Sequence, residues 1–265
     1  MDESGITQWS IQKYHATDVT DQLDWVVEES PVTVIVNGEA FATLLCSPTH
    51  LPELVTGFLA SEGVIQSATE IETITFNDAQ GFAYVALSKP LPDVIDYSKR
   101  VVGSCCGKSR QFYFQNDAKT AKTIMRSTNV SVQTCYALMA QLQKRSETFA
   151  LTGGMHNAAL AVEDHLKVVR ADIGRHNALD KIYGYLLNHN LRRHQAVIVF
   201  SGRISSEVLL KISKMGIGMI ISKSAPSHLA LKLADDLNIT IVGFVRDHKL
   251  NVYTHQERIN VSSKG

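Results

Sequence analysis

The sequence is poor in cysteine, with four in 265 residues, and none of them lies in a C-x-x-C spacing. The missing spacing argues against a zinc cluster, and so few cysteines indicate no disulfide framework. Cys105 and Cys106 are adjacent, and neighbouring Cα atoms about 3.8 Å apart are too close for an unstrained disulfide. We therefore expect free thiols and a reducing, cytoplasmic environment.

The chain also lacks net charge and long apolar runs. Lysine plus arginine and aspartate plus glutamate number 26 each, so the basic surplus typical of nucleic-acid-binding proteins is missing. No apolar run is long enough to cross a bilayer, and residues 1–14 contain no secretory signal. These absences predict a protein that binds neither nucleic acid nor membrane. With 45% hydrophobic residues, the chain can bury the core of one large or two small domains.

The first half of the chain contains two hairpin patterns. After a polar lead of about thirty residues, residues 31–45 alternate apolar side chains around Asn37-Gly38, which predicts a β-hairpin with a type I′ turn. Apolar residues then recur at helical spacing from Leu51, and Gly63 provides a stop. Residues 71–76 and 82–88 flank a turn at 78–81 and predict a second hairpin.

The second half alternates apolar runs with amphipathic segments, which is typical of an α/β fold. Helices are expected over residues 132–149, 177–187, 205–214 and 225–237. Strands are expected over residues 156–162, 166–172, 195–201, 217–222 and 239–245. The last three strands are continuous apolar runs, which predicts parallel strands covered on both faces. We place a domain boundary near Thr128.

Small and cationic residues follow each of the three parallel strands. They are Ser201-Gly202-Arg203, Ser222-Lys223-Ser224 and Val245-Arg246-Asp247-His248-Lys249. Carboxyl ends of parallel strands meet at one edge together with helix N-termini, so the pattern predicts an anion pocket for a phosphate-bearing ligand. The same residues also suit helix caps, turns and solvated surface charge, and both interpretations stay open. No G-x-G-x-x-G or P-loop motif is present to support a familiar nucleotide fold.

Two further segments, TGGMHNAAL and DIGRHNALDK, each place His-Asn-Ala after glycine. His156, Arg175 and His176 are candidates to face the pocket, although a histidine near a strand is more often structural. Asp172 suits a cap of the helix that starts near His176.

The adjacent cysteines lie in the segment VVGSCCGKSR. A thiolate is the reactive form of cysteine, and its pKa falls beside cations such as Lys108 and Arg110. Flanking small residues such as Gly107 bury little surface, which argues against a core position for the pair. The segment therefore predicts a nucleophilic or sulfur-carrying cysteine, with an inert buried thiol as the alternative.

Six motifs in order resemble the formate dehydrogenase accessory sulfurtransferases, the FdhD/NarQ family. They are SCCGK, TGGMHNAA, DIGRHNALDKIYG, SGRISSE, SKSAPSHLALKLA and GFVRDHKLNVYTHQERI, and the resemblance covers nearly everything after Pro31. It implies an α/β fold: a variable lead over 1–30, a smaller α+β domain over 31–128, and a three-layer cytidine-deaminase-like domain over 129–265. Members look like homodimers.

The resemblance also implies an activity. Members take sulfane sulfur from a cysteine desulfurase as a persulfide and deliver it to the molybdenum cofactor, bis(molybdopterin guanine dinucleotide), before its insertion into formate dehydrogenase. The cofactor is the bound substrate, and no permanently bound metal is expected. The family's guanine dinucleotide loop corresponds to Phe244 to Lys249. In the family's usual C-G-x-C motif, the first cysteine carries the persulfide, and its position corresponds to Cys106. Ser109 replaces the second cysteine of the motif. Cys105 is either an accessory thiol or has no role in sulfur transfer.

Two rival functions follow from the same residues. A zinc deaminase needs H-x-E and P-C-x-x-C, yet the chain reads His156-Asn157-Ala158 and has no C-x-x-C. A chaperone that binds the molybdenum cofactor without moving sulfur fits the anion pocket equally well. Only the cysteine segment distinguishes this chaperone from a sulfur carrier. For a sulfur carrier, we expect Cys106 to attack the desulfurase persulfide, with electrostatic support from Lys108 and Arg110.

Overall fold

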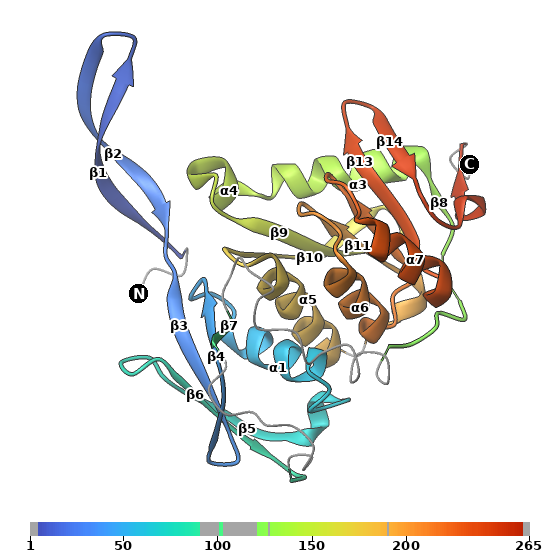
Figure 1. Cartoon of the computed structure of the whole chain (residues 1–265), viewed down its shortest axis with the longest axis horizontal. Helices are drawn as coiled ribbons and strands as arrows, with labels where there is room; N and C mark the ends of the chain where they lie inside the picture. The colour runs from blue at the N-terminus through green and yellow to red at the C-terminus, as the bar shows by residue number, and fades with distance from the viewer. Residues whose placement is uncertain (1–4, 91–100, 103–120, 127, 190, 262–265) are drawn as a thin grey trace.

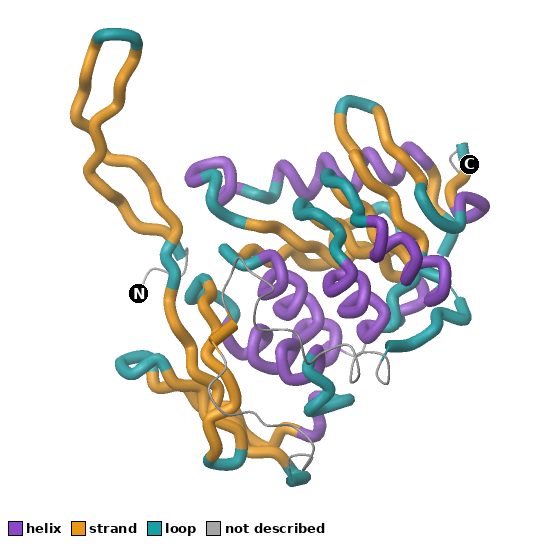
Figure 2. Tube along the Cα trace, in the orientation of Figure 1, coloured by secondary structure: helices purple, strands orange, loops and turns teal. Residues whose placement is uncertain are grey.

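The computed structural model describes residues 5–90, 101–102, 121–126, 128–189 and 191–261 (Figures 1 and 2). The first half contains β1 (Ile6–His15), β2 (Asp18–Val27), β3 (Ser30–Val36), β4 (Glu39–Cys46), α1 (Leu51–Ser61), β5 (Ile71–Asn77), β6 (Phe82–Leu87) and β7 (Val101–Val102). The second half contains β8 (Val130–Ser131), α3 (Val132–Lys144), α4 (Glu147–Thr152), β9 (His156–Val162), β10 (His165–Asp172), α5 (Arg175–His189), β11 (Ala196–Phe200), α6 (Ser206–Met215), β12 (Met219–Ser222), α7 (His228–Leu237), β13 (Thr240–Arg246), β14 (Lys249–Val252) and β15 (Ile259–Asn260).

The N-terminal sheet confirms both predicted hairpins. Its strand order is β5-β6-β3-β4-β7, with β3 antiparallel to β4 and β5 antiparallel to β6. Asn37 and Gly38 have φ angles of 50° and 88°, the positive values that a type I′ turn requires at both central positions. Helix α1 follows β4 directly, as the spacing predicts.

The C-terminal sheet has the order β10-β9-β11-β12-β13-β14. Strands β11, β12 and β13 are parallel, as their continuous apolar sequences predict. Helix α3 covers one face and α5, α6 and α7 cover the other (Figure 1). Alternate residues of each strand therefore enter two separate apolar clusters, and the α/β class is confirmed. The closer likeness to cytidine deaminase stays a prediction.

Several elements differ from the sequence-based expectations. The polar lead contains a hairpin, β1 with β2, that projects from the body (Figure 1). The helix expected over 132–149 ends at Lys144, and α4 begins anew at Glu147, because Arg145 and Ser146 leave helical backbone angles. Helix α7 begins three residues later than expected, with Ser227 as a cap whose hydroxyl accepts the Ala230 N–H.

Helices α1 and α5 cross at two glycines. A Cβ atom on Gly57 would lie 1.7 Å from the Asp180 carbonyl oxygen, and one on Gly184 would lie 2.0 Å from that of Glu53. Only a hydrogen atom fits at either place, so the two helix backbones touch directly. This crossing packs the N-terminal half against the C-terminal sheet's helical layer (Figure 2).

Two buried ion pairs and one half-buried pair surround the crossing. Lys181 on α5 lies 2.7 Å from Asp172 at the end of β10, and both side chains are fully buried. Lys211 on α6 pairs with Asp180 on α5, and Arg170 on β10 pairs with Glu53 on α1. A buried charge is strongly destabilising when its partner is removed, so these pairs favour one arrangement of the helices.

We predict that Gly57→Ala destabilises the protein by about 3 kcal/mol or more, because the added methyl group overlaps the α5 backbone. Helix propensity alone would give the opposite sign, since alanine is favoured over glycine by about 1 kcal/mol within a helix. Urea unfolding measures the difference. Gly153→Ala is the matched control, since a Cβ there meets nothing within 4 Å and only its positive φ opposes the change. Equal stability of Gly57→Ala and wild type would contradict the helix contact.

Candidate functional site at the strand ends

One edge of the C-terminal sheet gathers the candidate pocket residues. The parallel strands β11, β12 and β13 all end there. Strand β9 runs antiparallel to β11, so His156 at its start lies at the same edge, and it is paired with Asp172 at the end of β10. Neighbouring strands lie about 4.8 Å apart, so the edge from β10 to β13 is about 19 Å long.

The serines at this edge bind its loops to one another. The Ser222 hydroxyl donates to the Gly202 carbonyl oxygen at 2.8 Å, and the Ser224 hydroxyl donates to that of Ser201 at 3.0 Å. The Ser201 hydroxyl accepts the Asn157 N–H at 2.9 Å. These hydroxyls therefore hold the loops after β11 and β12 in place, and the buried Ser222 side chain does not line an open surface.

Cationic side chains extend from the loops after β11 and β12 and from the end of β13. Arg203, Lys223 and Arg246 are all exposed. Ser205 and Ser227 cap α6 and α7 by accepting the N–H groups of Val208 and Ala230, so both helix N-termini also lie at this edge. The structure thus brings together the cations and helix starts that the sequence predicts for an anion site.

His156, Arg175 and His176 lie at the β9 and β10 side of the edge. Burial and the neighbouring Arg175 charge lower the pKa of His156, with Asp172 opposing the shift. A Cβ on Gly202 would lie 2.8 Å from Phe200 Cζ and 3.5 Å from His156 Nδ1, so the imidazole lies against a glycine loop. His176 Nε2 lies 3.3 Å from Glu207 Oε2, which links the starts of α5 and α6. Sequence reasoning missed this glutamate, although it lies within the SGRISSE motif.

Asp172 lies before the cap position of α5, because the helix starts at Arg175, and its carboxylate binds a wider set of groups than a cap does. Its carboxylate accepts the Gly174 N–H at 2.8 Å, the Asn177 side-chain amide at 3.0 Å and the Ser47 N–H at 3.2 Å, and it pairs with Lys181. The residue therefore joins the loop after β4 to the start of α5. This contact fixes Arg175 and His176 relative to both halves of the chain.

The end of β13 turns sharply. Phe244 has a φ of 54°, and Asp247 and His248 have φ values of 50° and 55°, so Arg246 pairs with Lys249 across a two-residue turn. The Arg246 guanidinium lies 5.7 Å from the centre of the Phe244 ring. Val245 is buried in the apolar cluster under α3, and the His248 carbonyl oxygen accepts the Tyr136 hydroxyl at 2.8 Å. Of this segment, Val245 is therefore the buried residue, whereas the side chains of residues 246–249 are exposed.

The two described cysteines are chemically inert. Burial raises the pKa of Cys46 and of Cys135 to about 12 in each case. Such thiols carry almost no thiolate at neutral pH. The predicted sulfur-carrying residues Cys105, Cys106, Gly107, Lys108 and Arg110 lie outside the described residues.

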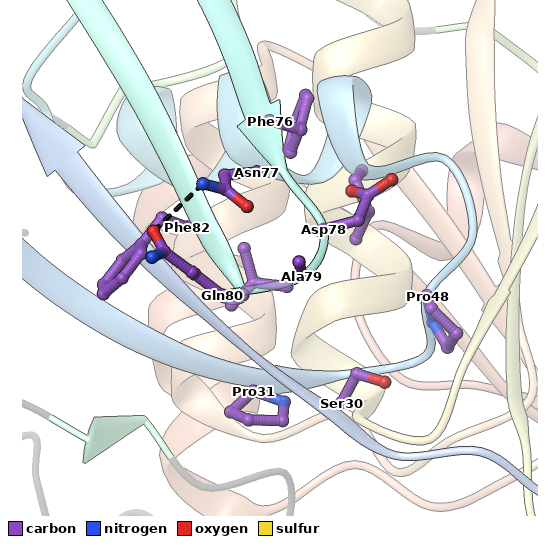
Figure 3. Close-up of a pocket in the computed structure, with 12 residues that line it drawn as sticks. Ser30, Pro31, Pro48, Phe76, Asn77, Asp78, Ala79, Gln80 and Phe82 are labelled. Carbon is purple, nitrogen blue, oxygen red and sulfur yellow. Dashed lines mark hydrogen bonds between the residues drawn. The ribbon is translucent and has the colours of Figure 1, made fainter.

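A pocket of about 570 Å³ lies in the N-terminal half, away from the strand ends (Figure 3). Pro31, Pro48 and Phe76 give it apolar walls, and Asp78 and Gln80 lie at the turn between β5 and β6. The Asn77 side-chain amide donates to Gln80 Oε1 at 3.0 Å, which closes this turn. All of its lining residues come from the segment 30–82, so the pocket is separate from the candidate anion site at the strand ends.

Neither a metal cluster nor a membrane span is found in the described part of the chain. No group of three or more histidine, cysteine, aspartate or glutamate side chains is arranged there to hold a metal ion. None of the described helices is both long and apolar enough to cross a bilayer.

The fold and the strand-end edge define an α/β protein with a candidate anion site. The chain belongs to the FdhD/NarQ family, whose model matches residues 27–260. It is 56% identical over 250 residues to the sulfur carrier protein FdhD of Geobacillus kaustophilus, covering 94% of this chain and 95% of that protein. The sulfur carrier protein FdhD of Bacillus subtilis is 53% identical over 250 residues, with the same coverage.

The fold is shared with a solved structure. The crystal structure of a proposed formate dehydrogenase accessory protein from Desulfotalea psychrophila superposes with a TM-score of 0.79. The alignment covers 96% of this chain and 99% of that chain, at 24% sequence identity.

We predict that Arg175→Gln raises the pKa of His156, because the substitution removes a like charge beside the imidazole. Titration of the histidine ring protons by NMR measures the shift. In the wild type, the lowered pKa leaves His156 mostly neutral at pH 7. Lys249→Gln is the matched control, since that lysine is not a cause of the shift. An unchanged titration in Arg175→Gln would show that the guanidinium does not act on His156.

Proposed function

We propose that this protein is a cytoplasmic sulfurtransferase that serves formate dehydrogenase. It receives sulfane sulfur on Cys106 from a cysteine desulfurase and passes it to the molybdenum of bis(molybdopterin guanine dinucleotide), which is its substrate. The loaded cofactor then enters formate dehydrogenase. The name that the relatives carry, sulfur carrier protein, supports sulfur transfer in general. We further propose that the working form is a homodimer.

The first chemical step is a thiol exchange at sulfur. The Cys106 thiolate attacks the terminal sulfur of the desulfurase persulfide, a new S–S bond forms, and the desulfurase cysteine leaves as its thiolate. Cys46 and Cys135 are unsuited to this attack, because burial raises each pKa to about 12. Lys108 and Arg110 support the Cys106 thiolate electrostatically.

The strand-end edge provides the substrate site. The single observation that carries this assignment is the convergence of Arg175, Arg203, Lys223 and Arg246 on one edge of one sheet. An edge about 19 Å long accommodates an elongated dinucleotide better than a single phosphate. We assign Phe244 to Lys249 to the guanine nucleotide and the β9 and β10 side, with His156, to the remainder of the ligand.

A cofactor-binding chaperone that moves no sulfur is the second candidate. It uses the same cations and the same edge, so binding of a nucleotide supports both functions equally. Persulfide formation on Cys106 supports the sulfurtransferase alone.

We predict that mass spectrometry finds one added sulfur atom on Cys106 after incubation with a cysteine desulfurase and cysteine. Cys106→Ala abolishes this mass shift and the maturation of formate dehydrogenase in a strain that lacks the accessory protein. Cys105→Ala, the matched control, retains much of both, because the resemblance to the family motif places the persulfide-carrying cysteine at Cys106. Intact cofactor binding without any added sulfur would favour the chaperone, and equal loss in both variants would contradict a one-cysteine carrier.

We predict that guanosine diphosphate binds at the strand ends and that its affinity falls as ionic strength rises. Arg246→Ala weakens binding by roughly 1.5–3 kcal/mol, because a charge-assisted contact to phosphate is lost. Isothermal calorimetry measures the change. Lys232→Ala on the exposed side of α7 removes the same charge away from the edge and leaves the affinity near that of wild type. An unaltered affinity in Arg246→Ala would remove that residue from the site.

A further inference from the structure

The hairpin formed by β1 and β2 extends away from the rest of the protein (Figures 1 and 2). Each strand is ten residues long, and every residue from Gln12 to Asp24 is exposed. Trp9, Tyr14 and Leu23 have exposed fractions of 66%, 67% and 61%. A two-stranded hairpin is marginally stable alone in water, and large exposed side chains of this kind are typical of a surface that contacts a partner.

The turn of the hairpin determines which backbone groups face outward. A two-residue turn at Ala16 and Thr17 makes His15 and Asp18 the closing hydrogen-bonded pair, and such pairs alternate with non-bonded pairs along the hairpin. The N–H and C=O groups of Gln8, Ser10 and Gln12 therefore point away from β2. Strand β1 thus presents a regular row of donors and acceptors for another strand.

Charge distinguishes the two free edges. Strand β2 carries Asp18, Asp21 and Asp24 and no basic residue, whereas β1 carries Lys13 and no acidic residue. Antiparallel pairing of β2 with a second β2 would bring six carboxylates onto two neighbouring strands, and like charges on neighbouring strands are destabilising. Pairing of β1 with a second β1 involves no such cluster. The aspartates therefore protect one edge and leave the other open.

We infer that β1 pairs antiparallel with β1 of a second copy of this chain, giving the four-stranded order β2-β1-β1-β2. An antiparallel pair of identical strands has two-fold symmetry, so each copy offers and receives the same contacts. Trp9 and Tyr14 gain cross-strand neighbours in this sheet, and the four strands exceed the number needed for independent stability. The inference rests on the proposed homodimer and names the surface that forms it.

Proline substitutions at one cross-strand pair test this edge assignment. Gln12 and Asp21 are register partners, and the N–H of each points outward from its own strand. Gln12→Pro removes a donor from the β1 edge without removing a hydrogen bond between β1 and β2, and Asp21→Pro does the same on the β2 edge. By sedimentation equilibrium of the full chain at micromolar concentration, we expect wild type and Asp21→Pro to be dimers and Gln12→Pro to be a monomer.

Amide hydrogen exchange gives an independent readout of the same contact. In the wild type, we expect slow exchange at Ser10 and Gln12 and fast exchange at Asp21 and Leu23, because only the β1 edge is paired. A monomeric wild type, loss of the dimer in both proline variants, or retention of the dimer in both would overturn the inference. Persulfide formation on Cys106 is measured separately. A monomer that still accepts sulfur would therefore contradict the pairing of β1 with a second β1, but it would not contradict the proposed sulfur transfer.

Discussion

The direct backbone contact between α1 and α5 is the constraint on which the arrangement of the two halves depends. Gly57 and Gly184 leave no room for a side chain, so the helices approach until main-chain atoms touch. Such a contact tolerates little rotation or sliding, since either movement would drive neighbouring side chains into the opposing backbone. Helix α5 also packs on β9 and β10, so its contact with α1 fixes where the N-terminal half lies relative to the strand-end edge.

The buried charges around this contact add specificity to its close packing. Asp172 is satisfied only when Ser47, Gly174, Asn177 and Lys181 are all in place, and these residues come from both halves of the chain. A displaced arrangement would leave a charged group buried without its partners, which is strongly unfavourable. The same network holds the first turn of α5, and so it orients Arg175 beside His156. The electrostatics of the edge thus depend on a contact made outside it.

Local signals in the sequence predicted most elements of the body. Asn37-Gly38 specifies its turn because both residues tolerate positive φ, and the continuous apolar runs specify buried parallel strands because both sheet faces are covered. The hairpin of β1 and β2 escaped prediction because its turn contains Ala16, a residue with no turn preference, in a left-handed conformation. The break between α3 and α4 also has no sequence signal, because Arg145 and Ser146 are neither glycine nor proline and lie within a continuous amphipathic pattern.

The sequence was sufficient to predict where the candidate site lies, but not which groups each of its side chains contacts. Strand order brings the chain segments to one edge, and the parallel runs reveal that order. Whether a serine there faces a ligand or a neighbouring loop depends on carbonyl groups supplied by other strands, such as that of Gly202 for Ser222. The charge network of Asp172 likewise joins residues more than a hundred positions apart, which no spacing pattern records.

The projecting hairpin and the strand-end edge share one loop. Val27, the last residue of β2, packs against Gly154, where an added Cβ would lie 3.1 Å from Val27 Cγ2. Gly154 precedes His156 by two residues, and Met155 between them is held by the Ser47 hydroxyl. A partner that fixes the hairpin would therefore also restrict the loop that positions His156. The proposed partner contact at the hairpin and the proposed ligand site at the edge therefore adjoin one short, well-packed segment.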